Sequence, residues 1–336
     1  MDAALFLNGA LGLLPVLAYL LALVWFDSYK LAPLRQLWPV LLAGVLTAVV
    51  CYHLNGVLLG HSDLALRDYS RWVAPFVEES VKATVVLWLF RTHRIGFVGD
   101  AALYGFAAGA GFALFENLLY LSQPGFGVVV WIVRGFGTAF MHGGTVALFA
   151  VLLLALDERS GRAGWRHGLP ALLLAGLIHA GFNHFVLKPL LQALLTVLVL
   201  VPLLHGVFRH AERKVAAWLG SGLDSGMEIL HLIHTGRLTD SPIGRYFHEI
   251  RERFSGEVAI DAICYLRLHT ELGLRAKGML LMREEGFDLP LDEETRRKLA
   301  ELGHLERSIG KTGLAALAPL LGQSRKDLWH LRTLLR

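Results

Sequence analysis

The sequence predicts an all-α protein, in which a polytopic bundle of membrane-spanning helices precedes a soluble helical domain. Hydrophobic residues make up 54% of the 336 residues and charged residues only 18%, against about 25% in an ordinary soluble domain. Residues 1–208 contain 12 Lys or Arg and 10 Asp or Glu, whereas residues 209–336 contain 20 and 18. We therefore expect a membrane domain at 1–208 and a water-facing domain at 209–336, which excludes a single soluble domain or a disordered chain.

Membrane-spanning helices are expected wherever about 20 consecutive residues are mostly apolar. Seven segments qualify, at roughly 4–26, 36–60, 73–91, 97–122, 127–156, 165–187 and 189–208. The first has no basic region before it and no small-residue cleavage site, so it is interpreted as an uncleaved span. The fifth is too long for one straight span and carries Arg134, so we interpret its start as a short interfacial or re-entrant helix leading into a span near 138–156.

The connections between these segments predict the orientation of the chain. Ten Lys or Arg residues fall in connections on one side of the membrane and three on the other. The positive-inside rule places the richer side in the cytoplasm. We therefore expect a multi-pass protein of the plasma membrane with its N-terminus outside and residues 209–336 in the cytoplasm.

The C-terminal part is expected to be a small all-α domain with a docking or stabilising role. Apolar residues recur at helical spacing over 257–285 and 292–309. Ser324, with Asp327 three residues later and Leu328 after it, resembles the start of a further helix.

Cysteine content and charge exclude two other classes of protein. The two cysteines, Cys51 and Cys264, are too few for a disulfide framework or a CxxC zinc motif. The formal net charge is +4, but the basic residues form no stripe with interleaved aromatic residues. We therefore expect no nucleic-acid partner.

Ionisable and polar residues lie inside four consecutive apolar segments, where each charged group costs about 2.5–3.5 kcal/mol to insert. These residues are Glu78, Glu79 and Lys82 in the third segment, Glu116 and Asn117 in the fourth, His142 in the fifth, and His179, Asn183 and His184 in the sixth. Each alone has a structural explanation, such as a buried ion pair or a hydrogen bond between helices. Together they favour one shared, hydrated site, because each group can then serve as a partner for the others.

Spacing within the segments supports this convergence. Lys82 lies four residues after Glu78 and three after Glu79, so it can contact either carboxylate on one helix face. Gly105 and Gly109 form a small-residue face that allows a neighbouring helix to approach closely.

The order of four motifs resembles the PrsW family of intramembrane proteases. The motifs are EExxK at Glu78–Lys82, FxxxEN from Phe112 to Asn117, the glycine-flanked His142, and HxxxN at His179 and Asn183. CAAX prenyl endopeptidases and bacteriocin-processing enzymes are also similar, but they usually have histidine at the position of Glu116 and arginine at that of Lys82. The resemblance to PrsW implies cleavage of membrane-anchored proteins, such as anti-sigma factors, within or near the bilayer.

Two catalytic chemistries remain open. Amide hydrolysis needs an activated water, a stabilised oxyanion and a proton for the leaving amine. In the first version, Glu78 is the base, by analogy with the glutamate enzymes of the superfamily, and His179 and Asn183 stabilise the oxyanion. His142 then orients water or substrate, and Glu79 supports Lys82 or the geometry of the site. In the second, Glu116, His142 and His179, with Glu79 as a further candidate, bind a divalent metal such as zinc, since two histidines and a carboxylate form a known catalytic zinc set.

Two other functions compete with proteolysis. Buried glutamate and histidine chains also carry protons, so a proton-coupled transporter is one alternative. A non-catalytic scaffold that binds membrane helices is the other. The absence of an internal repeat in the sequence favours the protease over the transporter. The expected partners are the lipid bilayer and a membrane-anchored protein substrate, and the sequence leaves the oligomeric state open.

Overall fold

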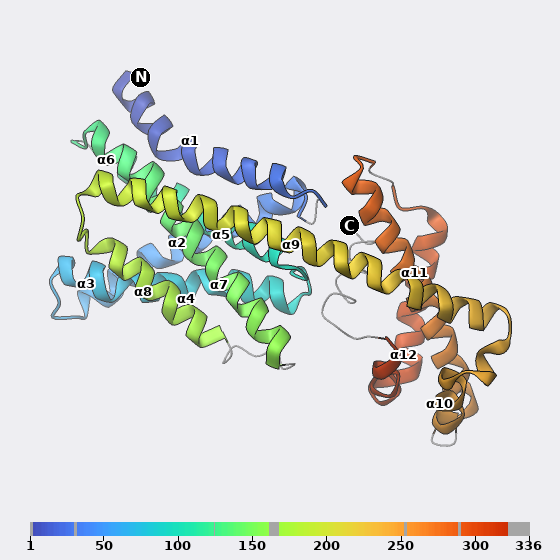
Figure 1. Cartoon of the computed structure of the whole chain (residues 1–336). Helices are drawn as coiled ribbons and strands as arrows, with labels where there is room; N and C mark the ends of the chain where they lie inside the picture. Colours follow the sequence, from blue (N-terminus) through green and yellow to red (C-terminus); the bar gives the residue numbers. More distant parts are fainter. Residues whose placement is uncertain are drawn as a thin grey trace. The chain divides into compact units, whose positions relative to one another are not determined.

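The computed structural model describes residues 3–29, 32–123, 125–160, 168–251, 254–287 and 290–321. These residues form helices joined by short connections, with no strand among them (Figure 1). The chain divides into two compact units, residues 1–212 and 213–336. The division falls inside one long helix, α9 (Pro189–His234), four residues beyond the domain boundary expected from the sequence.

The first unit is a bundle of helices. Its elements are α1 (Ala3–Phe26), α2 (Leu34–Gly60), α3 (Leu66–Trp72), α4 (Ala74–Arg91), α5 (Val98–Leu121), α6 (Val128–Ile132), the π-helix η1 (Val133–Thr138), α7 (Ala139–Ser160), α8 (Leu169–Asn183) and the first part of α9. Helix α4 has Pro75 in its first turn, a position that suits proline because proline lacks an N–H donor. Helix α5 begins where the Asp100 carboxylate accepts hydrogen bonds from the N–H groups of Gly96 and Phe97, both at 3.0 Å.

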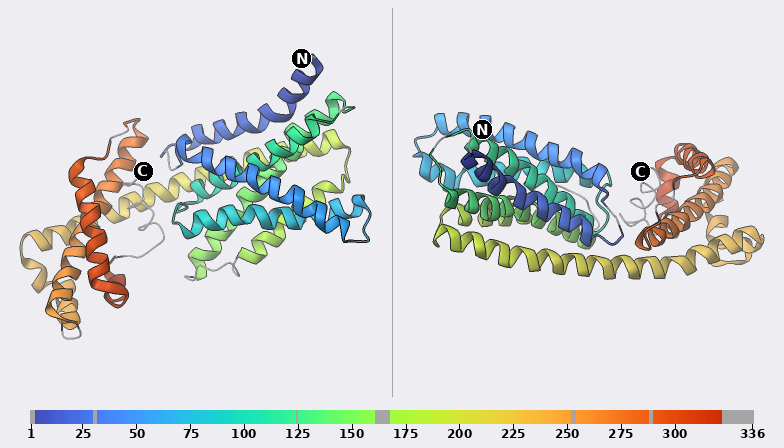
Figure 2. Two further views of the ribbon diagram at one scale, coloured as in Figure 1. Left: turned by 180° about the vertical axis from the view of Figure 1, so that it is seen from behind. Right: turned by 90° about the horizontal axis from the view of Figure 1, so that it is seen from above.

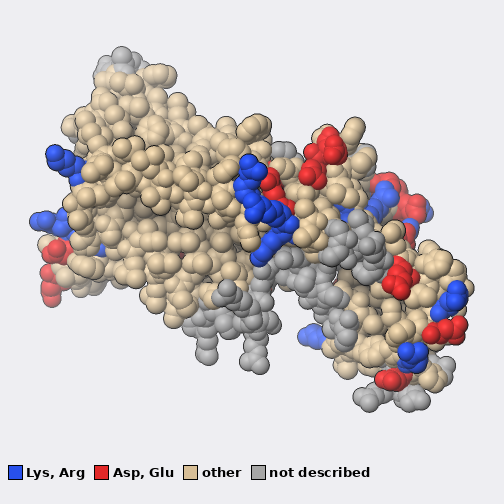
Figure 3. Space-filling view, in the orientation of Figure 1, with Lys and Arg blue, Asp and Glu red and all other residues tan. Residues whose placement is uncertain are grey.

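Five helical runs are long and apolar enough to cross a membrane, which confirms the polytopic helical class. They are Ala4–Phe26, Leu34–Gly60, Val98–Leu121, Val128–Asp157 and Pro189–Leu219. The expected count of seven is not confirmed, because α8 has only 15 residues and α4 carries three charged side chains near its start. On the face shown in Figure 3, the first unit presents a broad surface without charged residues, and its Lys, Arg, Asp and Glu lie toward its margins.

The fifth apolar segment differs from its expectation. We expected a separate interfacial or re-entrant helix before residue 138, whereas α6, η1 and α7 form one continuous helical run. The π-helix accommodates the buried Arg134 within this run. Its wider turn keeps the backbone bonded internally, so the chain need not leave the helix at this point.

Helix α5 lies at the centre of the bundle and packs closely on α2 and α7 (Figure 2). Its glycines allow backbone to approach backbone, as the small-residue pattern predicted. A Cβ atom on Gly109 would lie 2.1 Å from the carbonyl oxygen of His142, and one on Gly111 would lie 2.0 Å from that of Leu41. These contacts set the distance of α7 and α2 from α5.

The second unit contains the end of α9, the 3₁₀ turn η3 (Arg237–Asp240), α10 (Pro242–Arg251), α11 (Gly256–Glu284) and α12 (Glu293–Leu321). The helices predicted at 257–285 and 292–309 are confirmed as α11 and α12. Their apolar faces form a core that includes Leu266, Leu272 and Leu305. The helix start predicted at Ser324 and Asp327 lies outside the described residues.

Replacing Gly111 by alanine should destabilise the first unit. The added methyl group would meet the backbone of Leu41, and overpacking of this kind typically costs about 1–3 kcal/mol. Gly206→Ala is the matched control, because a Cβ at that position in α9 meets no atom within 4 Å. Thermal unfolding in detergent, followed by tryptophan fluorescence, should show a lower midpoint for Gly111→Ala alone. Equal midpoints for the two variants would contradict this packing.

Candidate functional site

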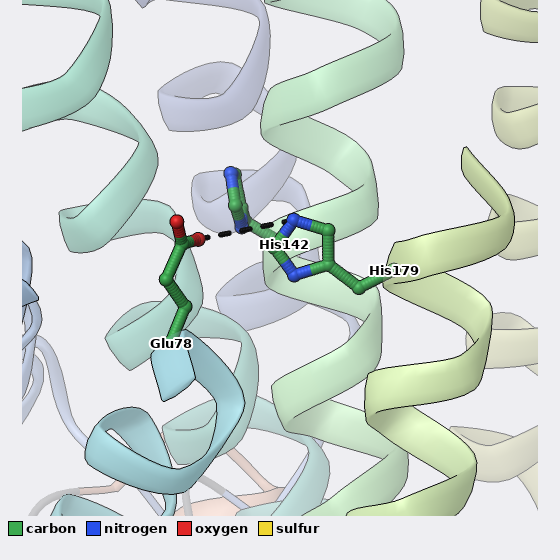
Figure 4. Close-up of side chains that lie close together, drawn as sticks. All are labelled: Glu78, His142 and His179. Carbon is green, nitrogen blue, oxygen red and sulfur yellow. Dashed lines mark ion pairs between the residues drawn. The ribbon is translucent and has the colours of Figure 1, made fainter. Parts of the chain in front are cut away.

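Helices α4, α7 and α8 bring one carboxylate and two imidazoles together inside the first unit. Figure 4 shows Glu78 on α4, His142 on α7 and His179 on α8 pointing toward one another. One potential ligand atom from each lies within 4.8 Å of the others. The two histidines are each at most 2% exposed, whereas the Glu78 side chain is 18% exposed. The convergence expected from the sequence is therefore present for these three residues.

Glu79 holds this group together. Its Oε1 atom accepts hydrogen bonds from Lys82 Nζ at 2.8 Å and from His179 Nδ1 at 2.9 Å. The Thr145 hydroxyl on α7 donates to the same oxygen at 3.2 Å. Glu79 is 2% exposed, so these donors replace the water that a carboxylate needs. The contact between Lys82 and Glu79 that the spacing allows is present.

Lys82 determines the protonation pattern of His142. Its ammonium group donates to His142 Nδ1 at 2.7 Å. Because an ammonium can only donate, Nδ1 is the unprotonated nitrogen, and Nε2 carries the proton that it donates to Glu116 Oε2 at 2.9 Å. Lys82 also lies 4.0 Å from the centre of the Phe112 ring, which adds a cation–π contact.

His179 is oriented in the same way by a carboxylate. Its Nδ1–H donates to Glu79, which leaves the Nε2 lone pair facing Glu78 Oε2 at 3.8 Å. Glu78 Oε2 also lies 3.9 Å from Lys82 Nζ. Each imidazole is thus held by its own carboxylate, Glu79 for His179 and Glu116 for His142, and the second nitrogen of each ring remains an acceptor.

Glu116 belongs to an outer network that sequence reasoning missed. Its Oε1 pairs with Arg134 Nη2 at 3.2 Å, and its side chain is 30% exposed. Arg134 Nε donates to Asn117 Oδ1 at 2.8 Å, and its guanidinium lies 3.6 Å from the Tyr120 ring centre. In the sequence, Arg134 served only to interpret the start of the fifth segment, although a lone basic residue in an apolar segment is itself a signal for a buried carboxylate partner.

The donor set fits a divalent metal such as zinc. Two imidazoles and a carboxylate form a catalytic zinc set. Metal-binding histidines usually donate their other N–H to a carboxylate, a backbone carbonyl or water, and both histidines of this site have a carboxylate there. The ligand atoms of one tetrahedral zinc lie about 3.4 Å from one another. The ligand atoms of Glu78, His142 and His179 would therefore have to move closer together to bind one ion. Binding through Nδ1 of His142 would also have to replace its bond to Lys82. The geometry favours Glu78 over the predicted Glu116 as the third ligand, because both Glu116 oxygens are engaged by Arg134 and His142.

Asn183 does not join the cluster, in contrast to its expected place beside an oxyanion. It is the last residue of α8, and its amide donates to the carbonyl oxygen of Ser70 at 3.0 Å. His184, which follows it, bonds to Ala180 and packs on Trp72. These two residues attach the end of α8 to α3.

An apolar pocket of about 550 Å³ lies beside the cluster, between α7, α8 and α9. Thr145 forms part of its wall and also donates to Glu79, so one side chain borders both the pocket and the cluster. Gly181 on α8 lines the pocket, and a Cβ at this position would meet no atom within 4 Å. The pocket is therefore open at the level of the residues that follow His179.

Comparison with known protein families matches residues 32–207 to the PrsW family, described as intramembrane metalloproteases. The chain belongs to this family. The match contains α2 to α8 and most of the candidate span in α9, and with them Glu78, His142, His179 and the carboxylates that orient the two imidazoles. No curated protein and no solved structure shows a significant match. Membership of the PrsW family identifies the chain as an intramembrane protease, and the candidate spans agree with a membrane protein.

Purified protein should retain a divalent metal through Glu78, His142 and His179. His142→Ala and His179→Ala should each lower the bound metal, because each removes one of three ligands. His210→Ala is the control, since His210 is exposed on α9. Metal content can be measured by mass spectrometry of the purified, dialysed protein. Equal metal content in wild type and His179→Ala would reject this ligand set.

Proposed function

We propose that this protein hydrolyses peptide bonds of membrane-anchored proteins with a water molecule activated among Glu78, His142 and His179. One observation carries the proposal. A partly exposed carboxylate faces two buried imidazoles whose orientation is imposed by two further carboxylates. Such preorganisation is expected of a reacting centre, because the groups need not rearrange when charge develops.

Glu78 is the residue best placed to move protons. Its contacts, at 3.4, 3.8 and 3.9 Å, are longer than the 2.8 and 2.9 Å bonds that Glu79 makes to Lys82 and His179. A carboxylate has about four lone-pair sites, so Glu78 can hold a cation with one oxygen and accept a proton with another. A divalent metal bound by Glu78, His142 and His179 would lower the pKa of water and polarise the substrate carbonyl.

The reaction then follows from the positions of these side chains. The water oxygen bonds to the carbonyl carbon while its proton passes to Glu78. The carbon–nitrogen bond breaks as Glu78 returns that proton to the leaving amine. Lys82 contributes a positive charge that stabilises the developing oxyanion, because its ammonium lies between Glu79 and His142 beside the reacting centre.

We propose that the substrate is an anti-sigma-factor-like regulator or another protein with a membrane anchor. The pocket between α7, α8 and α9 suits an apolar segment of such a substrate. Helices α7 and α9 belong to candidate membrane spans, so an apolar chain within the bilayer can reach the pocket from the side. Thr145 continues the pocket wall to Glu79 and thereby to the reacting centre.

Glu78→Gln should abolish cleavage, because the amide can neither take a proton from water nor return it. Mass spectrometry of membrane peptides from cells expressing each variant should show a set of products in wild type that Glu78→Gln lacks. Glu293→Gln is the control, since that side chain on α12 is 76% exposed. Identical peptides in wild type and Glu78→Gln would refute the assignment, and altered proton uptake without altered peptides would instead favour a transporter.

Filling the pocket should slow cleavage without touching the cluster. Gly181→Leu adds a side chain where the pocket has space, and it should lower the rate of product formation severalfold. Gly206→Leu adds the same side chain to an open position on α9 that does not line the pocket. Quantifying the same products in membranes with equal amounts of protein compares the two. Unchanged cleavage by Gly181→Leu would show that substrate does not use this pocket.

A further inference from the structure

The amide that faces the reacting carboxylate belongs to Asn55 on α2, not to Asn183. Asn55 Nδ2 donates to Glu78 Oε1 at 3.4 Å. We infer that Asn55, held by Tyr69, is a positioning residue that sets the orientation of the Glu78 carboxylate. This inference rests on the proposed function, because it assigns a role in the same reaction to residues outside the four motifs.

The two oxygens of Glu78 have different surroundings. Oε2 faces His179 Nε2 and Lys82 Nζ, whereas Oε1 faces the Asn55 amide. The contacts at Oε2 are both longer than 3.5 Å, so they constrain the rotation of the carboxylate only weakly. The Asn55 amide is therefore the contact that keeps Oε1 on the α2 side and Oε2 among the basic groups.

Tyr69 determines which end of the Asn55 amide meets Glu78. Its hydroxyl donates to Asn55 Oδ1 at 2.9 Å, and the residue is only 3% exposed on α3. With its oxygen occupied by this donor, Asn55 presents its NH₂ group to the carboxylate. If the amide were reversed, Asn55 Oδ1 would face Glu78 Oε1, and the two negatively polarised oxygens would repel each other.

The hydrogen bonds from Tyr69 to Asn55 and from Asn55 to Glu78 form a relay, and helix α3 connects this relay to α8, which carries His179. The Asn183 amide donates to the Ser70 carbonyl at 3.0 Å, and Arg71 donates to the His184 carbonyl at 3.5 Å. Tyr69 lies next to Ser70, so the end of α8 and the Asn55 amide are both tied to α3. The relay therefore fixes Glu78 relative to His179 through backbone and side-chain bonds outside the cluster.

Two variants test the relay against a matched control. Asn55→Leu removes the amide, and Tyr69→Phe removes only the hydroxyl that orients it. Tyr104→Phe is the control, because the hydroxyl of the buried Tyr104 likewise donates to a side-chain amide oxygen on α2, Gln36 Oε1 at 2.7 Å. The assay uses the purified full chain and a synthetic peptide that spans a cut site found in the membrane-peptide comparison.

Asn55→Leu should lower kcat about 10–100-fold with little change in KM, as is typical when a residue supporting a reactive group is lost. Tyr69→Phe should also lower kcat, but by a smaller factor than Asn55→Leu. Tyr104→Phe should keep the wild-type kcat even if it unfolds at a lower temperature. Wild-type kcat in both Asn55→Leu and Tyr69→Phe, with Glu78→Gln inactive, would overturn the positioning role and leave the proposed function standing. An active Glu78→Gln would instead overturn the proposed function itself.

Discussion

One carboxylate oxygen, Oε1 of Glu79, organises the centre of this molecule. A buried carboxylate is tolerated only when other groups replace its hydration, and an unpaired one costs several kcal/mol. The donors that replace water come from three helices, with Lys82 on α4, Thr145 on α7 and His179 on α8. These helices cannot separate without exposing an unpaired charge to an apolar interior. The same bonds orient the His179 imidazole, so the packing requirement and the site geometry have one cause.

Each of the two buried histidines of the site is oriented by a hydrogen bond to a carboxylate. Glu79 orients His179, and Glu116, itself paired with Arg134, orients His142. The outer network reaches α1, because the Asn117 amide donates to the Gly12 carbonyl at 2.6 Å. Glu78 differs from these two carboxylates in the length of its contacts, which are 3.4, 3.8 and 3.9 Å. The surroundings thus hold both imidazoles through short bonds, whereas the Glu78 carboxylate is oriented by the longer contact from Asn55.

Much of the architecture could be predicted from the sequence, because it depends on local spacing. Helical periodicity located α11 and α12, and the three- and four-residue intervals placed Lys82 within reach of Glu79 and Glu78. Convergence of Glu78, His142 and His179 followed from the cost of isolated polar groups in apolar segments. The pairing of Glu116 with Arg134 and the contact of Asn183 with Ser70 could not be predicted in this way. They depend on how far each helix rotates and where it ends, and α8 ends at Asn183 itself.

The π-helix at Val133–Thr138 changes the directions in which the side chains on either side of it point. Arg134 and His142 are eight residues apart, and a regular α-helix, advancing about 100° per residue, would point them about 80° away from each other. Both nevertheless reach the same carboxylate, Glu116. The wider winding of η1 absorbs that angular difference. The irregular turn thus brings the two basic side chains toward the same side of the helix, where one acid serves both.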